Sequence, residues 1–248
     1  MRIGVTVHLK QNRTHMARKT KEAALETRTL IVDAAERVFY EQGIACTSLA
    51  DIAHAAGVTR GAIYWHFKNK GEVFAALFER VKLPLEELAL ASLDAREPDP
   101  LGRIRDKMVH CLRDTTRDPS SRRVLEILFH KCEFTAGSGD LRTRHEANVN
   151  QGRANIEGGL RNAVTRQQLP HDLDLRRAAV LLHGMITGML WDWLFTPDCI
   201  DLPGEAEGIV DAWLDMLRVS PTLRIPRDLT DNRMDHAPDK QTGKLRNA

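Results

Sequence analysis

The fold is decided by Thr47-Ser-Leu-Ala-Asp-Ile-Ala-His-Ala-Ala-Gly-Val-Thr-Arg-Gly-Ala-Ile-Tyr-Trp-His-Phe67, in which two short helical patterns flank one glycine. Leu49 and Ile52 recur at helical spacing and give the first pattern an apolar stripe. Gly57 lies where a tight turn between two helices requires a positive φ. The stretch therefore predicts a helix-turn-helix over roughly residues 48–67.

Polar residues mark the start of both short helices. Ser48 and Asp51 have the spacing of a capping box, and Thr59 can cap the second helix. Ile63 and Phe67 are one turn apart in that second helix, so both face the interior. This orientation determines the residues that point outward, which are Thr59, Arg60, Gly61, Tyr64, Trp65 and His66.

The outward residues suit the major groove of DNA. Exposed rings add little to stability, whereas Arg60 can donate to guanine, and Tyr64 and His66 can bind phosphates. Gly61 would let the helix approach the base edges, and Lys70 would add a phosphate contact near the positive end of the next helix. An ordinary helical corner is the alternative, and it leaves the exposed rings and the lysine unexplained.

The composition limits where such a site can lie. The chain has 248 residues, 42% of them hydrophobic, and a net charge of only +2. A DNA site must therefore be a local patch, because the protein is not a polycation. The four cysteines are Cys46, Cys111, Cys132 and Cys199. They form no CxxC pair, which fits a reducing cytoplasm and argues against a zinc site, although a redox-sensing thiol stays an alternative.

Apolar residues recur at helical spacing almost throughout, so we predict an all-α fold of about nine helices. The expected helices are 27–42, 48–57, 60–67, 70–83 with a continuation past Pro84, 100–117, 119–134, 140–168, 178–195 and 203–219. We place a DNA-binding domain at 25–85 and a ligand-binding and dimerisation domain at 86–220. Residues 1–24 are predicted to be an unstructured arm, and residues 221–248 a disordered polar tail.

One segment, residues 178–195, is apolar enough to be mistaken for a membrane span. It contains His183 and Asp192 and is barely long enough to cross the hydrocarbon layer of about 30 Å. We interpret it as a buried helix of a bundle and expect no membrane partner.

The motif TRGAIYWHFK over 59–68, with Gly43 and Thr47 upstream, resembles the TetR family of one-component repressors. Segments outside the DNA-binding region, EILFHKCEF over 126–134 and WLFTP over 193–197, are similar to the Acr-type repressors of multidrug efflux operons. The resemblance implies a cytoplasmic, nucleoid-associated homodimer that docks through its last two helices. Each third helix would enter a major groove, with DNA contacts at Thr47, Arg60, Tyr64, Trp65, His66 and Lys70.

The resemblance also implies an effector pocket between the fourth helix and the helices after it. Periodicity proposes lining residues that are mostly apolar, and such side chains suit a permissive pocket: Phe78, Met108, Cys111, Leu112, Phe129, Cys132, Glu133, Met185, Met189 and Trp193. Each of them has plain core packing as its alternative. Glu133 either meets a cationic drug or caps a neighbouring helix. The expected effector is a small, mostly apolar or cationic molecule.

No nucleophile elbow, phosphate loop or metal-ligand spacing is present, so we expect no enzyme, no cofactor and no metal. The partners expected are double-stranded operator DNA, a small-molecule effector and a second copy of the chain. A TetR-type repressor or activator of another operon, with a different ligand, remains the alternative, because one fold serves many circuits. We expect the fourth helix to transmit the effect of a bound ligand, because it would touch both the pocket and the reading head, which is the DNA-binding domain at 25–85.

Overall fold

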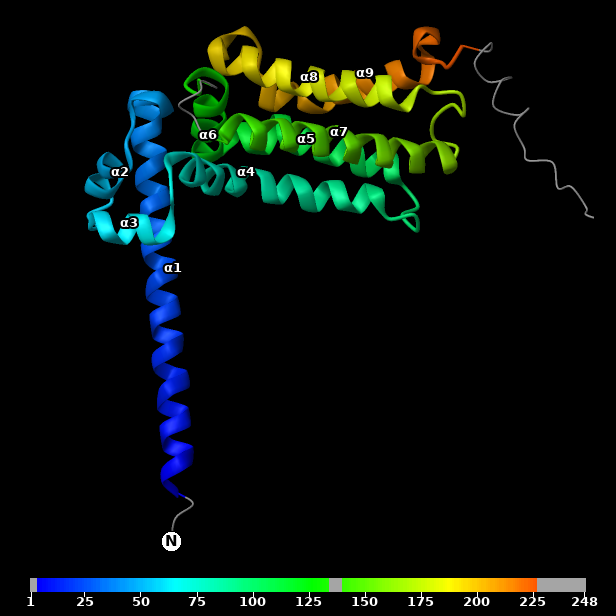
Figure 1. Ribbon diagram of the computed structural model, residues 1–248. Coiled ribbons are helices and arrows are strands. Elements are labelled where there is room, and N and C mark those ends of the chain that lie inside the picture. Colours follow the sequence, from blue (N-terminus) through cyan, green and yellow to red (C-terminus); the bar gives the residue numbers. More distant parts are fainter. Residues whose placement is uncertain (1–3, 134–139, 227–248) are drawn as a thin grey trace, which may run out of the picture.

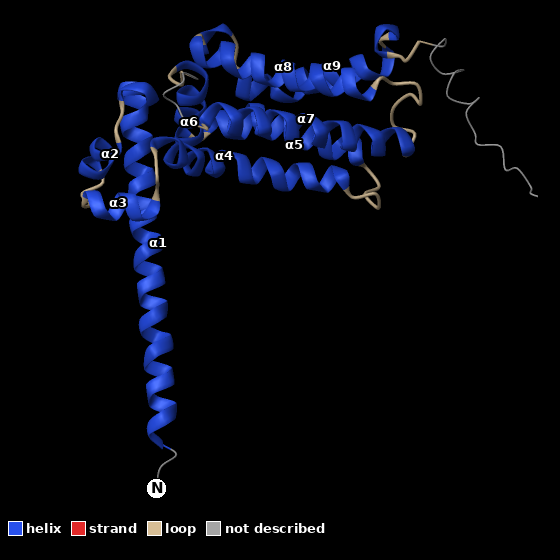
Figure 2. Ribbon diagram, viewed as in Figure 1, coloured by secondary structure: helices blue, strands red, loops and turns tan. Residues whose placement is uncertain are grey.

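The structure is a computed structural model that describes residues 4–133 and 140–226, with side chains described from Lys21 onward. Its regular structure is helical, in line with the predicted all-α class (Figures 1 and 2). The elements are α1 (Gly4–Cys46), α2 (Leu49–Ala55), α3 (Arg60–His66), α4 (Lys70–Leu93), α5 (Pro100–Arg117), α6 (Pro119–His130), α7 (Leu141–Thr165), α8 (Leu175–Phe195), the 3-10 helix η2 (Pro197–Cys199), α9 (Leu202–Val219) and the 3-10 helix η3 (Pro221–Leu223).

The first helix is much longer than the sequence pattern predicted. We expected residues 1–24 to lack structure, but residues 4–24 form the start of α1, which projects away from the rest of the chain in Figure 1. No proline or glycine lies between Gly4 and Gly43, so nothing interrupts the helical hydrogen bonds as they extend outward from the packed part. Gly43, at φ 76°, breaks the helix before its last residues, as expected.

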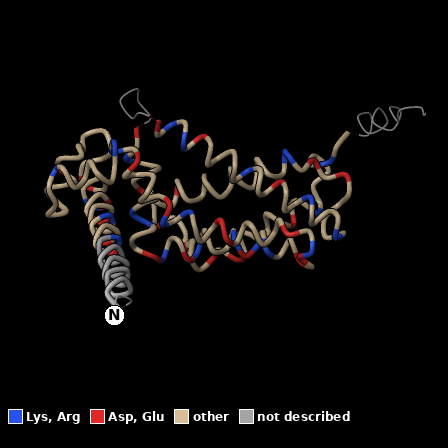
Figure 3. Tube along the Cα trace, turned by 60° about the horizontal axis from the view of Figure 1, so that its bottom comes forward, with Lys and Arg blue, Asp and Glu red and all other residues tan. Residues whose placement is uncertain are grey.

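The helices that follow α3 form a layered bundle. In Figure 1, α4 lies on one side, α5 and α7 form the middle, and α8 and α9 cover the other side. Asp99 and Asp118 cap α5 and α6, each ahead of a proline at the first helical position. Pro84 lies inside α4 without ending it, so this helix runs from the reading head into the bundle. Figure 3 shows acidic and basic residues interleaved along the bundle helices, consistent with the small net charge.

Two predicted boundaries in the second half of the chain were wrong. Helix α6 ends at His130 and not near residue 134, because Lys131 leaves helical φ/ψ and its carbonyl accepts from the Ile44 amide at 3.2 Å. The start of the predicted tail is also packed: Leu223 is 3% exposed, and the Arg224 guanidinium donates to the Leu217 carbonyl at 3.0 Å. Residues 134–139, and residues 227–248 with the rest of the predicted tail, lie outside the described residues.

The apolar helix α8 is the one described helix whose length and composition would allow it to cross a membrane. Ala178, Leu182, Leu190 and Leu194 are buried in the bundle, as expected of a core helix. The opposite face of α8 is exposed and apolar, and Phe195 remains 67% exposed. Burial inside one chain therefore accounts for only one face of this helix.

Candidate DNA interface and effector cavity

The helix-turn-helix forms as the sequence predicted. The Ser48 hydroxyl accepts from the Asp51 amide at 3.2 Å, and the Asp51 carboxylate accepts from the Ser48 amide at 2.9 Å. Gly57 has φ 67° in the turn, and the Thr59 hydroxyl accepts from the Ala62 amide at 3.1 Å. These local bonds satisfy amides that the ends of short helices would otherwise leave without partners.

Packing of α3 against α1 and α2 determines which side of α3 faces outward. Ile63 is fully buried and Phe67 is 3% exposed, with the Arg28 guanidinium lying 5.2 Å from the Phe67 ring. Tyr64 and Trp65, by contrast, are 59% and 72% exposed. Thr59, Arg60 and Gly61 are exposed on the same helix. The predicted inward and outward residues are therefore separated as expected.

His66 differs from the other outward residues because it is half-buried. Its ring lies 4.5 Å from the Trp65 ring at 88°. Desolvation, followed by the charge of Arg28, lowers the pKa of His66 below its usual 6.5. The ring is accordingly neutral at pH 7 and would bind a phosphate through a hydrogen bond, without an ion pair.

Thr47 and Lys70 are built into the scaffold of the reading head. Thr47 is 3% exposed, and its hydroxyl donates to the Gly43 carbonyl at 2.7 Å. The Lys70 ammonium donates to the Ala45 carbonyl at 2.7 Å and to the Thr47 carbonyl at 3.1 Å. Both residues therefore hold the end of α1 against the start of α4, a role that the sequence motif did not reveal.

A cavity of about 460 Å³ lies inside the bundle, between α4, α5, α6, α7 and α8. Of the ten residues predicted to line an effector pocket, this cavity brings together four: Phe78, Met108, Cys111 and Phe129. Burial raises the pKa of the Cys111 thiol to about 11, so this sulfur is an unreactive part of the wall at neutral pH.

The other six predicted residues are not among those that line the cavity. Leu112 is fully buried in the core, and Trp193 donates through its indole nitrogen to the Ile200 carbonyl at 3.1 Å. Glu133 is exposed beyond the end of α6, where it would not meet a bound drug. Cys132 and Met189 pack against the core, and Met185 is half-buried on α8. The helical period identifies an inward face, but a cavity touches only part of such a face.

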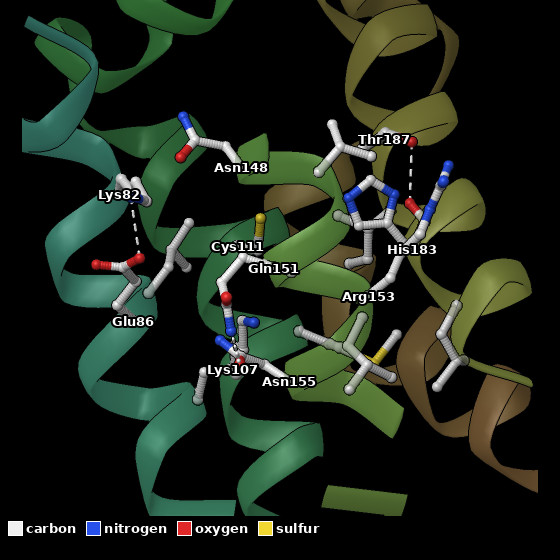
Figure 4. Close-up of a pocket in the computed structure, with 18 of the residues that line it drawn as sticks. Lys82, Glu86, Lys107, Cys111, Asn148, Gln151, Arg153, Asn155, His183 and Thr187 are labelled. Atoms are coloured by element: carbon white, nitrogen blue, oxygen red, sulfur yellow. Dashed lines mark hydrogen bonds and ion pairs between the residues drawn. The ribbon is translucent and has the colours of Figure 1, made fainter. Parts of the chain in front are cut away.

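The polar and charged lining residues were not predicted, because the periodicity of apolar residues cannot indicate them. Figure 4 shows several of them around the cavity, projecting from α4, α5, α7 and α8: Lys82, Glu86, Lys107, Asn148, Gln151, Arg153, Asn155 and His183. One feature of the sequence could have indicated them, namely a cation on an otherwise apolar helix face. Lys107, one turn before Cys111, is an example.

The charges in the cavity fall into two groups. On α4, Lys82 forms ion pairs with Glu86 at 3.1 Å and with Glu79 at 3.4 Å. On the other side, desolvation lowers the pKa of His183, and the charges of Arg153, Lys107 and His145 add to this effect. Burial also lowers the pKa of Lys107. The second group is therefore a region of positive potential.

Two connections join the cavity to the reading head. On α4, the cavity residue Phe78 stacks on Phe74 at 6.3 Å, and Phe74 meets Phe39 of α1 edge-on at 6.2 Å. On α6, Ser120 and Arg123 each donate to the buried Glu36 carboxylate of α1 at 2.6 Å. A change in the cavity walls can therefore reach α1 through both helices, and α6 is a route that we did not predict.

Within the described residues, no group of three or more histidine, cysteine, aspartate or glutamate side chains could hold a metal ion.

The chain matches two family models. Residues 31–77 match the bacterial regulatory proteins of the tetR family, and residues 99–219 match the C-terminal region of MAATS-type transcriptional repressors.

This chain aligns with similar proteins over nearly the whole length of each of them. The HTH-type transcriptional regulator TtgR of Pseudomonas putida is 48% identical over 209 residues, covering 84% of this chain and 100% of that protein. The crystal structure of NalD, the secondary repressor of the MexAB-OprM multidrug efflux pump in Pseudomonas aeruginosa, is 34% identical with a TM-score of 0.71 and covers 80% of this chain and 99% of that one. A SmeT–triclosan complex is 34% identical with a TM-score of 0.72 and covers 82% and 96%; SmeT is the repressor of the Stenotrophomonas maltophilia pump SmeDEF.

Proposed function

Because the chain belongs to the TetR family of bacterial transcription regulators, we propose that it represses a multidrug efflux operon and leaves its operator when a small molecule fills the cavity. The observation that carries the proposal is the combination of an exposed reading helix and a cavity in the bundle, joined by α4. NalD and SmeT, which repress efflux pumps, support the choice of operon. The protein acts in the cytoplasm, on the nucleoid.

In this proposal α3 enters the major groove. Arg60 reads a guanine, Gly61 lets the backbone approach the bases, and Tyr64, Trp65 and His66 contact the sugar-phosphate backbone. Thr59 contributes from the start of α3. Thr47, which follows α1, and Lys70, at the start of α4, hold the reading head in place, and the Lys70 charge adds to the attraction for phosphates.

A homodimer through α8 and α9 is part of the proposal. Val180, Trp191 and Phe195 of α8 are 44%, 47% and 67% exposed on one face. Nothing lies within 4 Å of a side-chain carbon added at Gly184 or Gly188, so a partner helix can approach that face closely. Gly188→Arg should convert the dimer into monomers, as measured by analytical ultracentrifugation. A dimer that survives this change would refute the assigned face.

The proposed mechanism follows from linkage. A ligand that favours a dimer with misplaced heads must weaken operator binding by the same coupling free energy, typically about 1–3 kcal/mol. Filling the cavity displaces α4 through Phe78, and α4 alters the separation of the two α3 helices. For heads one turn apart on DNA that separation must be about 34–36 Å, or a multiple of it.

Transcript levels test the choice of operon. Deleting the gene should raise transcription of an efflux operon, and the purified protein should protect a palindromic site in that operon's promoter. If protection and derepression instead map to genes without a transporter, the efflux assignment is wrong and the alternative, a TetR-type regulator of another operon, is correct.

A further inference from the structure

The charge of the cavity is unbalanced. Among the described lining residues, Glu86 is the one carboxylate, whereas Lys82, Lys107 and Arg153 are basic. Glu86 is already bound to Lys82 on α4. The remaining cations, Lys107 and Arg153, therefore line a largely apolar cavity without a counter-charge of their own.

Lys107 projects from the middle of α5 into this space. In the described part of the chain no carboxylate lies within ion-pairing distance of its ammonium group. Burial lowers the pKa of Lys107, which means that desolvation outweighs the weak attraction of Glu86 and Cys111. A desolvated ammonium group gains strongly from an anion that arrives with a ligand.

Arg153 of α7 gives the clearer signal. Its Nε is buried and has no hydrogen-bond partner among the described residues. Buried donors without an acceptor are rare and unfavourable, so an N–H group of this kind requires a water molecule or a bound ligand as its acceptor. Arg153 is also near enough to His183 of α8 for its charge to lower the pKa of that ring, and both residues lie on one side of the cavity in Figure 4.

The rest of the lining offers contacts to an apolar group. Its apolar side chains include Phe78, Met108, Leu125, Phe129 and Ile186, from four helices. A volume of about 460 Å³ falls in the usual range for a pocket that holds a drug-sized molecule.

From this arrangement we propose that the effector is an organic anion, with an aromatic or otherwise apolar body and one carboxylate or acidic phenolate group. The acid group lies between Arg153 Nε, Lys107 Nζ and the His183 ring, and the apolar body contacts Phe78 and Phe129. This inference rests on the proposed function, because it names the ligand class of the same cavity. It departs from the expectation of a cationic drug, which would meet Lys107 and Arg153 and would have to displace Lys82 from Glu86.

Three probes of nearly equal shape separate the charge of a ligand from its size. They are 2-naphthylacetate, its neutral primary amide and the cation 2-(2-naphthyl)ethylammonium. Calorimetric titration of the full-length dimer should give an affinity for the carboxylate about tenfold to a hundredfold above that for the amide, with the cation weakest. Tighter binding of the amide or the cation overturns the proposal, as does a carboxylate that fails to bind at about 1 mM.

Two variants locate the acid group. Arg153→Gln and Lys107→Met should each weaken carboxylate binding about tenfold and change amide binding less than about threefold. Arg161→Gln, on the exposed face of the same helix α7, is the matched control and should leave all three affinities unchanged. Equal losses for the carboxylate and the amide in Arg153→Gln would mean that Arg153 only supports the cavity wall, and this result would overturn the assignment.

Operator binding separates a failure of this inference from a failure of the proposed function. Gel-shift assays with the three probes should show release from the operator by the carboxylate first. Release by the cation alone contradicts the inference and leaves the proposed function intact. Binding of the carboxylate without any effect on the operator complex supports the inference and contradicts the proposed function.

Discussion

Changing Glu36 to Gln removes one charge from the contact between the reading head and the bundle. The Glu36 side chain is 7% exposed and accepts from Arg123, whose side chain is 42% exposed, and from Ser120 at 2.6 Å. Glutamine keeps the shape and can still accept from Ser120. The variant therefore loses mainly the charged part of one bond.

The magnitude follows from the exposure of the two partners. Breaking a fully buried ion pair costs about 3–5 kcal/mol, and an exposed pair contributes about 0.2–1 kcal/mol. One buried and one half-exposed partner place the loss between these limits, at about 1.5–2 kcal/mol. A loss of that size lowers the Tm of a domain of this length by about 3–8 °C.

Thermal unfolding followed by circular dichroism measures the effect. Glu146→Gln on α7 is the matched control, because its partner Arg142 is 70% exposed and Glu146 itself is 58% exposed. In gel shifts, Glu36→Gln should also reduce the ratio of operator affinities measured without and with ligand, because part of the signal passes from α6 to α1. If Glu36→Gln and Glu146→Gln have the same Tm and the same ratio, the route through α6 does not exist.

Four other predictions concern the reading head, the cysteines and the buried histidines. Tyr64→Ala should weaken operator binding about tenfold to a hundredfold without changing the Tm, since its ring is exposed; unchanged gel-shift affinity would refute the assigned face of α3. Lys70→Ala should weaken binding to all DNA sequences alike and reduce the salt slope by about 1, and it should lower the Tm because two carbonyls lose their donor; altered base preference would contradict the phosphate role. Replacing all four cysteines with serine should leave ligand-induced release unchanged, because burial holds the thiol pKa values of both Cys111 and Cys132 near 11; lost release would revive the redox alternative. Desolvation holds the pKa values of His145 and His183 below 6.5, so the unfolded chain binds more protons and stability should fall as the pH drops through 6.5; a urea midpoint that does not fall between about pH 7.5 and about pH 5.5 would show that these rings titrate normally.

The helix-turn-helix was predictable because its determinants are local. The capping pair Ser48 and Asp51, the turn glycine Gly57 and the inward pair Ile63 and Phe67 all lie within one short stretch, so spacing alone defined their roles. The caps of α5 and α6 are equally local, because each is an aspartate followed directly by a proline.

The cavity was predictable only in part, because its walls come from five helices that are distant in sequence. Periodicity identified Met108 and Cys111 on the inner face of α5, but it could not show that Trp193 packs beside Ile200 or that Lys107 points into the same space. The buried Nε of Arg153 depends on where α7 and α8 meet, and no local pattern encodes that meeting point.

In the proposed mechanism, filling the cavity changes the separation of the two α3 helices. Double electron–electron resonance measures that separation directly. Each protomer carries one spin label, attached to a cysteine that replaces His54, an exposed residue of α2, and its native cysteines are serine. We expect one narrow distance distribution on operator DNA and a shifted distribution when 2-naphthylacetate is bound. Identical distributions with and without a ligand that calorimetry shows to be bound would contradict this mechanism.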